Sequence, residues 1–596
     1  MIVPMAKIFC AVAATDQSAL LTALGTLGVI HLQAVDPSEA QADAELQRNL
    51  ASCDKAVALL SGLEATPSSP PPADPLTVAH DIINLAQHEH ENQQRLRNLN
   101  AQRDDLGPWG TVVLDDLARL DAAGAVVSLY LVPRDQVDMV SAPVCLRMPW
   151  ADKKRALMLV IERPQQAAQL PEDSEAIPRP ERDAASLEAE ITRLDNEMKT
   201  IAQRRAELAT HRPALQATRE SLDARVRWQT AERSGLADDA LFAVQGWIPA
   251  ENCAALADDL AAAGLSVAVD SRPPQDDEQP PTLVRYPRWA QPIKGLFDMM
   301  GTVVGYREVD VSPAFIIALP LFAAILIGDA GYGLLLTLLL VGMRGKVIAA
   351  MGLPFANLGL IIGLATIAWG LVTNGFFGFQ PFGPDAALIE VSLREASRQR
   401  MMELSFWIAA IHLSFAWAWQ ALRLYPDLRF LAPLGWALVV WGMLGVVFYL
   451  LLGPEAYGFS WATPWPWLLI VGTTLGVVFH GTQRNPLVRI GAGVGNGLLE
   501  LLGKFSDEIS YVRLMAVGLA STVLAQNFNQ MAGLGPEGSG FGALTPVILV
   551  LGHLLNFALC MIALFAHGVR LNMLEFSNNL GMQWSGYAYQ PFRHNA

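Results

Sequence analysis

The sequence predicts a two-part protein. Its N-terminal half is expected to carry α/β lobes on a long antiparallel coiled-coil rod, and its C-terminal half to be an all-α polytopic membrane domain. Charged residues, glutamine and alanine dominate up to about residue 290, whereas apolar runs recur from residue 313 onward. Those runs have the length of about 15 to 25 residues that a membrane helix requires. Apolar residues at heptad spacing in the first half are typical of a coiled coil. We therefore expect a cytosolic arm over 1–290, a linker over 291–312 and a membrane domain over 313–596.

Composition excludes several classes of protein. The 596 residues are 52% hydrophobic, which is too apolar for an ordinary soluble protein of several domains. The net charge of −15 argues against nucleic-acid binding. Five scattered cysteines without a CxxC pair fit a reducing compartment and predict neither a disulfide framework nor a metal site. The first residues lack the basic region of a signal peptide and are expected to form a strand.

The arm is expected to contain α/β lobes at about 1–40, 106–170 and 236–275. β-Branched and apolar runs predict strands, and one amphipathic run predicts a helix over 253–263. The strand candidates are 7–13, 29–35, 125–132, 156–161, 241–248 and 265–270. No Gly-x4-Gly-Lys-Ser/Thr loop, GxSxG or HExxH motif occurs, so the sequence predicts no nucleotide site, no cofactor and no catalytic residues.

Two coiled-coil segments are expected, at about 41–105 and 182–235. The clearest heptad repeats every seventh residue, at Leu187, Leu194, Ile201, Leu208, Leu215 and Leu222. Pro213 is expected to divide this helix into two pieces, because proline removes a backbone donor and clashes with the preceding turn. A compact helical bundle is the alternative to an extended rod.

Seven apolar runs mark the membrane domain. They lie near 313–343, 355–375, 404–422, 430–452, 463–480, 508–526 and 544–569. Short basic loops with Arg344/Lys346, Arg423/Arg429 and Arg484/Arg489 follow the first, third and fifth runs, and positive loops stay in the cytosol. Seven simple spans would put all three loops on the other side from a cytosolic arm.

Splitting the first run into a hairpin resolves this conflict. Its centre contains Gly328, Asp329, Gly331 and Gly333, which is turn chemistry. The sequence then predicts about eight membrane helices, with short ones near 313–327 and 332–343 and both termini cytosolic. Seven spans remain the alternative. Asp329 is expected to cap the turn in preference to binding an ion, and the last two helices are expected to be long and tilted.

One arginine lies inside the sixth apolar run, and another lies at the end of the seventh. Arg513 lies inside the segment 498–526, and a permanently charged group at membrane depth indicates a functional site by default. Arg570 lies near the end of its run, where an arginine that extends to the lipid headgroups is the alternative.

Motifs in these segments carry a family resemblance. The sequence contains PPTLVRYP before the membrane half, then PLFAAILIGDAGYGLLL, KFSDEISYVRLMAVGLA, HGVRLNMLEF and a terminal YQPF, together with GWIP in the arm. In this order they resemble the membrane stator subunit of V/A-type rotary ATPases, called subunit a or subunit I. The resemblance covers the whole chain.

The resemblance implies that Arg513 and Arg570 face a rotating proteolipid c-ring and that two offset half-channels carry H⁺ or Na⁺. It also implies peripheral stalk subunits of the E/G type and a central-stalk membrane adaptor as partners, in a bacterial inner membrane. The candidates for the half-channels are Glu500, Asp507, Glu508, Ser510, Tyr511, His553, Asn556, His567 and Glu575. The chain departs from the family where Cys560 replaces a carboxylate.

Two other functions remain open at this point. An ion-coupled secondary transporter would contain inverted repeats with matching broken helices, and the sequence has one broken run, at 328–333, without an evident partner. A membrane scaffold without an ion path is the other alternative.

Overall fold

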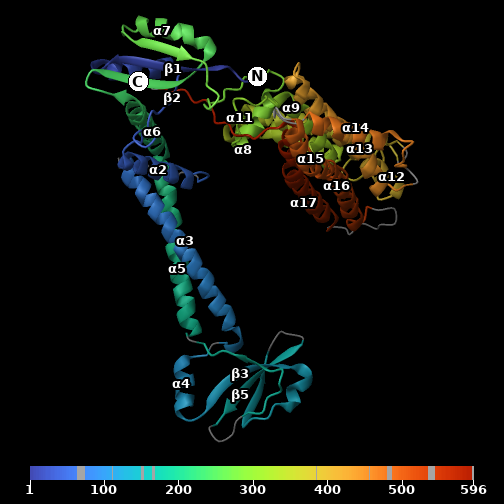
Figure 1. Ribbon diagram of the computed structural model, residues 1–596. Helices are drawn as coiled ribbons and strands as arrows, with labels where there is room; N and C mark the ends of the chain where they lie inside the picture. The colour runs from blue at the N-terminus through green and yellow to red at the C-terminus, as the bar shows by residue number, and fades with distance from the viewer. Residues whose placement is uncertain are drawn as a thin grey trace. The chain divides into compact units, whose positions relative to one another are not determined.

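The computed structural model of the chain describes residues 1–63, 74–110, 112–149, 154–163, 168–180, 182–383, 386–454, 457–479, 486–534 and 544–593, with the backbone alone at 486–496 and 498 (Figure 1). The chain divides into two compact units. Unit 1 comprises Met1–Cys10, Val29–His31 and Gly246–Pro591, and unit 2 comprises Ala11–Gly28, Leu32–Gln245 and Phe592–Ala596.

The first sheet draws its strands from both ends of the arm. Its order is β2 (His31–Gln33), β8 (Leu241–Pro249), β1 (Met5–Ala13) and β9 (Ala268–Arg272), and β7 (Leu236–Ala237) pairs with β8. The arm also contains α1 (Gln17–Leu27) and α7 (Cys253–Ala262). The segments 1–40 and 236–275 therefore both contribute strands to one sheet.

A charge cluster joins β1 to the chain beyond β9 within unit 1. Glu278 accepts from Arg272 at 2.6 and 2.9 Å and from Lys7 at 2.8 Å. These side chains are largely shielded from solvent. The hydrogen bonds from Arg272 and Lys7 outweigh the effect of burial and lower the pKa of Glu278 from 4.5 to about 2.

Unit 2 contains a second sheet with four antiparallel-paired strands. The order is β4 (Val144–Met148), β5 (Arg155–Glu162), β3 (Val126–Pro133) and β6 (Glu175–Ile177), with α4 (Leu114–Ala122) beside β3. Leu129 pairs with Leu159 in the central register, and these residues contribute to one apolar core with Trp109. The predicted strands 125–132 and 156–161 correspond to β3 and β5.

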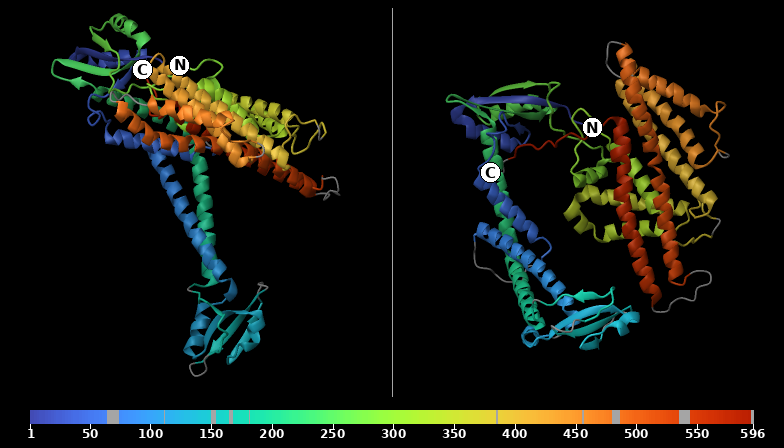
Figure 2. Two further views of the ribbon diagram at one scale, coloured as in Figure 1. Left: turned by 45° about the vertical axis from the view of Figure 1, so that its right-hand side comes forward. Right: turned by 60° about the horizontal axis from the view of Figure 1, so that its bottom comes forward.

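Four helices connect this sheet to the rest of unit 2: α2 (Ala44–Leu59), α3 (Pro75–Asp105), α5 (Ala184–Leu208) and α6 (Arg212–Ser234). Helix α3 lies beside α5, and α2 lies beside α6 (Figures 1 and 2). The heptad leucines line the contacts, because Leu187 and Leu194 pack with Leu99, whereas Leu215 and Leu222 pack near Cys53.

Proline divides the second helical run, as the sequence predicts. A short 3₁₀ turn, Ala209–His211, separates α5 from α6. Pro213 lies in the first turn of α6, where the missing backbone N–H has no intrahelical partner to lose. The description of the whole arm as a coiled-coil rod stays a prediction.

The C-terminal half is helical. Five described stretches are long and apolar enough to cross a membrane: Arg344–Val372, Glu395–Leu424, Leu428–Leu451, Leu499–Met531 and Thr545–Leu580. Three shorter apolar helices, Ser312–Ile327, Ala330–Gly342 and Pro464–Val478, accompany them. The number of crossings, eight or seven, stays a prediction. Arg484 and the side chain of Arg489, which belong to the third predicted basic loop, lie outside the described residues.

The helices of this half are α9 (Ser312–Ile327), α10 (Ala330–Gly342), α11 (Arg344–Val372), α12 (Glu395–Leu424), α13 (Leu431–Leu451), α14 (Pro464–Val478), α15 (Pro486–Ile509), α16 (Val512–Met531) and α17 (Thr545–Ala563). Helices α16 and α17 lie side by side (Figure 2). The segment 291–312 is more ordered than the expected linker. It contains α8 (Lys294–Met300), which buries Leu296 and Phe297 because they follow Ile293 at helical spacing.

The turn between α9 and α10 depends on one buried carboxylate. Gly328 has φ +74°, which a residue with a Cβ rarely adopts. Asp329 then accepts backbone N–H groups of Gly331 at 2.7 Å, Tyr332 at 3.3 Å, Phe377 at 2.8 Å and Gly378 at 2.9 Å. Both carboxylate oxygens are thereby occupied in holding the turn against the loop after α11.

Candidate functional site

A break between α15 and α16 positions Arg513. Helix α15 ends at Ile509, and α16 begins at Val512. Arg513 Nη2 donates to Ser510 Oγ at 3.0 Å across the break. One quarter of the Arg513 side chain is exposed, whereas its Nη1 is buried.

Arg570 lies in a segment with unusual helical winding. Two π-helical stretches, Leu564–Gly568 and Leu571–Phe576, flank it. In an α-helix, residues five apart point about 140° away from each other. In a π-helix the backbone hydrogen bonds join residues five apart, so the side chains of two such residues lie closer to the same face of the helix. The winding therefore brings Glu575 to Arg570, with Nε and Oε1 3.6 Å apart.

Glu575 lies between the two arginines. Its Oε1 is 3.5 Å from Arg513 Nη1 and 3.6 Å from Arg570 Nε. The Glu575 side chain is 4% exposed, whereas Arg570 is 52% exposed. One carboxylate with two guanidiniums leaves a net positive charge. A buried charge is tolerated where it is paired. We therefore infer that the buried Glu575 carboxylate holds both guanidiniums in place, and we call it the anchor of the two arginines.

Further polar side chains continue from Glu575 along the bundle. Asn579 donates to the backbone oxygen of Glu575 at 2.5 Å and to Asp507 Oδ2 at 2.8 Å. Trp417 Nε1 on α12 donates to Asn579 Oδ1 at 2.9 Å. We call Asp507, Arg513, Arg570, Glu575 and Asn579 the arginine cluster.

Tyr511 and His412 form a second contact layer beside this cluster. Tyr511 is fully buried, and its hydroxyl lies 2.7 Å from His412 Nδ1. The His412 ring stacks on Phe576 at 4.5 Å between centroids and 19° between planes. Glu508 is fully buried one turn before Tyr511, and neither of its oxygens has a hydrogen-bond partner within the described residues.

Another polar cluster lies between α10, α16 and α17. His553 contacts Tyr332 OH at 2.8 Å through Nδ1 and Asn529 Oδ1 at 3.0 Å through Nε2. Asn556 Nδ2 donates to Tyr332 OH and to the Ser521 backbone oxygen, both at 2.9 Å. We call Tyr332, Ser521, Asn529, His553 and Asn556 the tyrosine cluster.

Cys560 adjoins the tyrosine cluster, because its Sγ lies 3.1 Å from Ser521 Oγ. The cluster contains no carboxylate. Ser521 follows Arg513 by eight residues on the same helix, about 12 Å at helical rise, so the two clusters lie at different depths along α16.

Within the described residues, two candidates from the sequence make no hydrogen bond or ion pair with either cluster. Glu500 forms an ion pair with Lys504 at 2.9 Å. Lys504 in turn lies 4.6 Å from the centroid of a Trp417 ring. His567 is half-buried and precedes Arg570 by three residues on the same helix. No group of three or more His, Cys, Asp or Glu suited to a metal ion occurs in the described parts of the chain.

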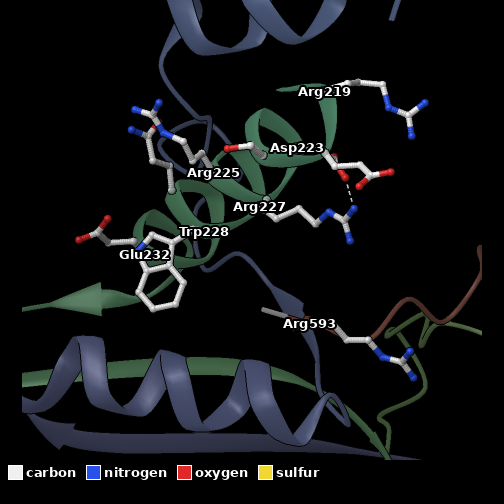
Figure 3. A pocket seen from close by; sticks show the side chains of 11 residues that line it. Arg219, Asp223, Arg225, Arg227, Trp228, Glu232 and Arg593 are labelled. Atoms are coloured by element: carbon white, nitrogen blue, oxygen red, sulfur yellow. Dashed lines mark hydrogen bonds and ion pairs between the residues drawn. The ribbon is translucent and has the colours of Figure 1, made fainter. Parts of the chain in front are cut away.

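A separate hollow of about 980 Å³ lies in unit 2, on α6 and near Arg593 (Figure 3). Its side chains carry both signs of charge: Arg227 pairs with Asp223, and Arg219 pairs with Asp54 at 3.7 Å. No glycine-rich loop adjoins α6 in the sequence, so the hollow lacks the phosphate-binding element of a nucleotide site.

Comparisons with known proteins find homologues of the chain. No family model matches the chain. The chain is 29% identical over 629 aligned residues to V-type ATP synthase subunit I 1 of Treponema pallidum, and the match covers 100% of both chains. It is 25% identical to V-type ATP synthase subunit I of Borreliella burgdorferi, with 87% of each chain covered. The chain is a homologue of these subunit I proteins. The resemblance in the motifs is thereby confirmed.

More distant relatives agree. A-type ATP synthase subunit I of Methanocaldococcus jannaschii is 24% identical to this subunit I homologue, over 71% of this chain and 64% of that protein. A solved structure of the cytoplasmic N-terminal domain of subunit I, a homologue of subunit a of V-ATPase, matches 45% of this chain and all of that one at 15% identity. Its TM-score is 0.22, so this likeness carries no structural argument.

The sequence did not predict several polar residues that lie in or beside the two clusters of this subunit I homologue. His412, Asn579 and Ser521 were not among the expected site residues. His412 carries a signal that could have found it, because it is the one histidine in the apolar run 404–422. Asn579 and Ser521 carry no such signal, since small polar residues are common in membrane helices.

Proposed function

We propose that this subunit I homologue is the membrane stator subunit of a V/A-type rotary ATPase. It would couple translocation of H⁺ or Na⁺ to ATP hydrolysis or synthesis. The observation that carries the proposal is the placement of Glu575 between Arg513 and Arg570. The arrangement supplies a fixed positive group at membrane depth, which is the element that a rotary stator requires.

The exposed side of α17 and its extension fits a rotating partner. Arg570 is half exposed, and large apolar side chains are exposed on the same helical segment. They are Leu551, Leu555, Leu559, Ile562, Phe565 and Leu574. An arginine on an apolar membrane surface is costly unless a partner covers it. A proteolipid c-ring with ionisable carboxylates supplies an apolar surface and an opposite charge.

The proposed mechanism follows from charge and solvation. A ring carboxylate that holds its ion is neutral and can face lipid, whereas an ionised carboxylate cannot. When a ring carboxylate passes Arg513 and Arg570, their positive charge favours the ionised form of the carboxylate, which then releases its ion. The same charge blocks a direct leak, so each ion travels with the ring.

The two polar clusters support two offset half-channels. The arginine cluster, with Glu508, Ser510 and Tyr511, would serve one route, and Glu500 and His567 would lie at its edges. The tyrosine cluster, with Cys560, would serve the other. Asp329 is assigned to the turn, because backbone N–H groups occupy both of its oxygens.

The arm would connect the membrane domain to peripheral stalk subunits of the E/G type, and a central-stalk membrane adaptor would bind nearby. With the N-terminal half and the C-terminus in the cytosol of a bacterium, the subunit would lie in the inner membrane. A stator has to resist torque, and the paired helices α3 and α5 would give the arm stiffness.

Replacement of Arg513 by Ala tests the role of the arginines. We expect ATP-driven ion uptake into vesicles to be abolished while the complex still assembles. Replacement of Arg429 by Ala, in an exposed loop with Asp427 2.9 Å away, is the control and should leave uptake unchanged. Normal uptake by the Arg513 variant would contradict the proposal.

Co-purification separates the rotary function from its two alternatives. Extraction in mild detergent should recover a ring proteolipid and nucleotide-binding subunits with this chain. Transport by the chain alone would favour a secondary transporter, and recovery without ring or transport would favour a scaffold. A cysteine at Gly345 should be labelled only from the cytosol if eight helices cross the membrane.

A further inference from the structure

A groove between α9 and α12 is lined almost entirely by apolar side chains. It has a volume of about 700 Å³, with Ile317 and Leu321 on one wall and Ile411 and Phe415 on the other. Along α12 it extends from residue 408 to 422, about 21 Å at helical rise. One leaflet of a bilayer core is about 15 Å deep. The groove is therefore long enough to hold one acyl chain that reaches from the interface to the bilayer centre.

A polar hollow of about 610 Å³ adjoins one end of the groove. The two spaces share Pro313 and Trp419, and Trp289 lines the groove at this end. Tryptophan is typical of the level of lipid headgroups and glycerol. The charged groups that line the hollow are Arg285, Glu308, Asp310, Arg423 and the amino group of Met1.

Most of these charged groups form ion pairs or hydrogen bonds within the protein. Arg285 forms an ion pair with Glu251, and Asp310 forms one with the amino group of Met1. Glu308 accepts backbone N–H groups of Gly305 at 2.7 Å and Trp584 at 3.1 Å, and a further one from residue 583.

Arg423 differs from the other charged groups of the hollow. Its Nη2 donates to the Arg307 backbone oxygen at 3.3 Å, and within the described part of the chain no carboxylate pairs with it. An exposed guanidinium therefore remains uncompensated at the mouth of an apolar groove. A ligand that matches both features has one negative group and one long hydrocarbon chain.

We propose that these adjoining spaces bind an anionic glycerophospholipid, with its phosphate at Arg423 and one acyl chain in the groove. A single arginine near an anionic membrane surface contributes about 1 kcal/mol to lipid attraction. The acyl chain would cover His412, which also lines the groove. Because His412 stacks on Phe576, next to Glu575, the lipid would form an outer wall of the arginine cluster. The proposal does not depend on the role of the arginines in transport.

Native mass spectrometry of the full chain tests the proposal. The protein is extracted from nanodiscs that contain phosphatidylglycerol and phosphatidylcholine, and the lipids that stay bound are counted. We expect wild type to retain phosphatidylglycerol in preference. Arg423→Gln should reduce that preference about five-fold, the value of one surface cation. Ile411→Trp should fill the groove and reduce retention of both lipids.

Matched variants separate the site from general membrane effects. Arg429→Gln removes a neighbouring loop cation, and Leu338→Trp adds the same bulk at an exposed apolar position of α10. Both should retain phosphatidylglycerol as wild type does. Equal retention by the Arg423 and Arg429 variants would overturn the proposal, as would retention of phosphatidylcholine equal to that of phosphatidylglycerol. A photoreactive group at Ile411 that cross-links to polypeptide instead of lipid in the assembled complex would also overturn it.

Discussion

The Glu575→Gln substitution removes the one carboxylate that contacts both arginines. The change keeps the size of the side chain and its buried position and leaves two guanidiniums without an anionic partner. We expect Arg513 and Arg570 to repel each other and to leave their shared position. Ion pumping would then fail although both arginines are present.

The magnitude follows from the distances. At 3.5 and 3.6 Å and an effective dielectric constant of about 20, each guanidinium–carboxylate contact is worth about 5 kcal/mol before the costs of desolvation and screening are subtracted. Arg570 is half exposed, so its contact is weakened more than that of Arg513. Loss of one buried partner of a charge pair typically costs about 2 kcal/mol or more. That cost corresponds to a roughly 30-fold smaller population with both guanidiniums in place.

The assay is ATP-driven ion uptake into vesicles that contain the assembled complex, with ATP hydrolysis measured in parallel. We expect uptake to fall at least about ten-fold. Asp427→Asn is the control, because Asp427 is a carboxylate outside both polar clusters that pairs with Arg429 at 2.9 Å. Full uptake in the Glu575 variant, or an equal loss in both variants, would refute the assignment of Glu575 as the anchor.

Three further predictions concern stability. Asp329→Asn replaces an acceptor oxygen by a donor and should cost about 3 kcal/mol, seen as a lower midpoint of thermal unfolding; an unchanged midpoint would show that the turn does not need the charge. Gly370→Ala should lower the free energy of unfolding by at least about 2 kcal/mol, because a Cβ at Gly370 would lie 2.1 Å from a backbone nitrogen of α10. Gly342→Ala is the control and should be neutral, because a Cβ there meets no atom within 4 Å. Similar midpoints of thermal unfolding for the two variants would contradict the packing. Glu278 has a pKa lowered from 4.5 to about 2, so its contribution is present above pH 4.5 and is lost as the pH falls toward 2. Near neutral pH, Glu278→Gln should reduce the protection of β1 from hydrogen exchange by about 2 kcal/mol, after allowance for solvent screening. The difference from wild type should vanish toward pH 2. A difference that does not change with pH would exclude the ionised Glu278 carboxylate as its cause.

Periodicity and composition predict much of the fold. The strands of the arm, the heptad contacts of Leu187 and Leu215, and the division at Pro213 follow from local patterns that the structure repeats. Sheet pairing does not follow in the same way, because strands from distant segments pair according to tertiary packing and not to local sequence. Helix α8 likewise falls in the segment expected to be a linker, since seven residues are too few to carry a clear helical period.

Some residues of the candidate site can be predicted from local sequence, whereas its contacts between distant segments cannot. A charge inside an apolar run is visible in the sequence, and this alone singles out Arg513. The contact between Arg570 and Glu575 has no such signal, because residues five apart diverge in an α-helix and meet here only through π winding. His412 reaches Tyr511 from a helix about one hundred residues earlier, and that proximity exists only in the folded chain.

The pairing of β1 with β8 governs the order in which the protein can be assembled on the ribosome. The first strand leaves the ribosome with its hydrogen-bonding edges open, and its neighbour is synthesised more than two hundred residues later. At about 5 to 20 residues per second that delay is roughly 10 to 50 s. During this interval an apolar strand is exposed to aggregation, so a chaperone that shields the nascent N-terminus should raise the yield of the protein. The sheet can be completed only shortly before α9, the first apolar helix of the C-terminal half, is synthesised.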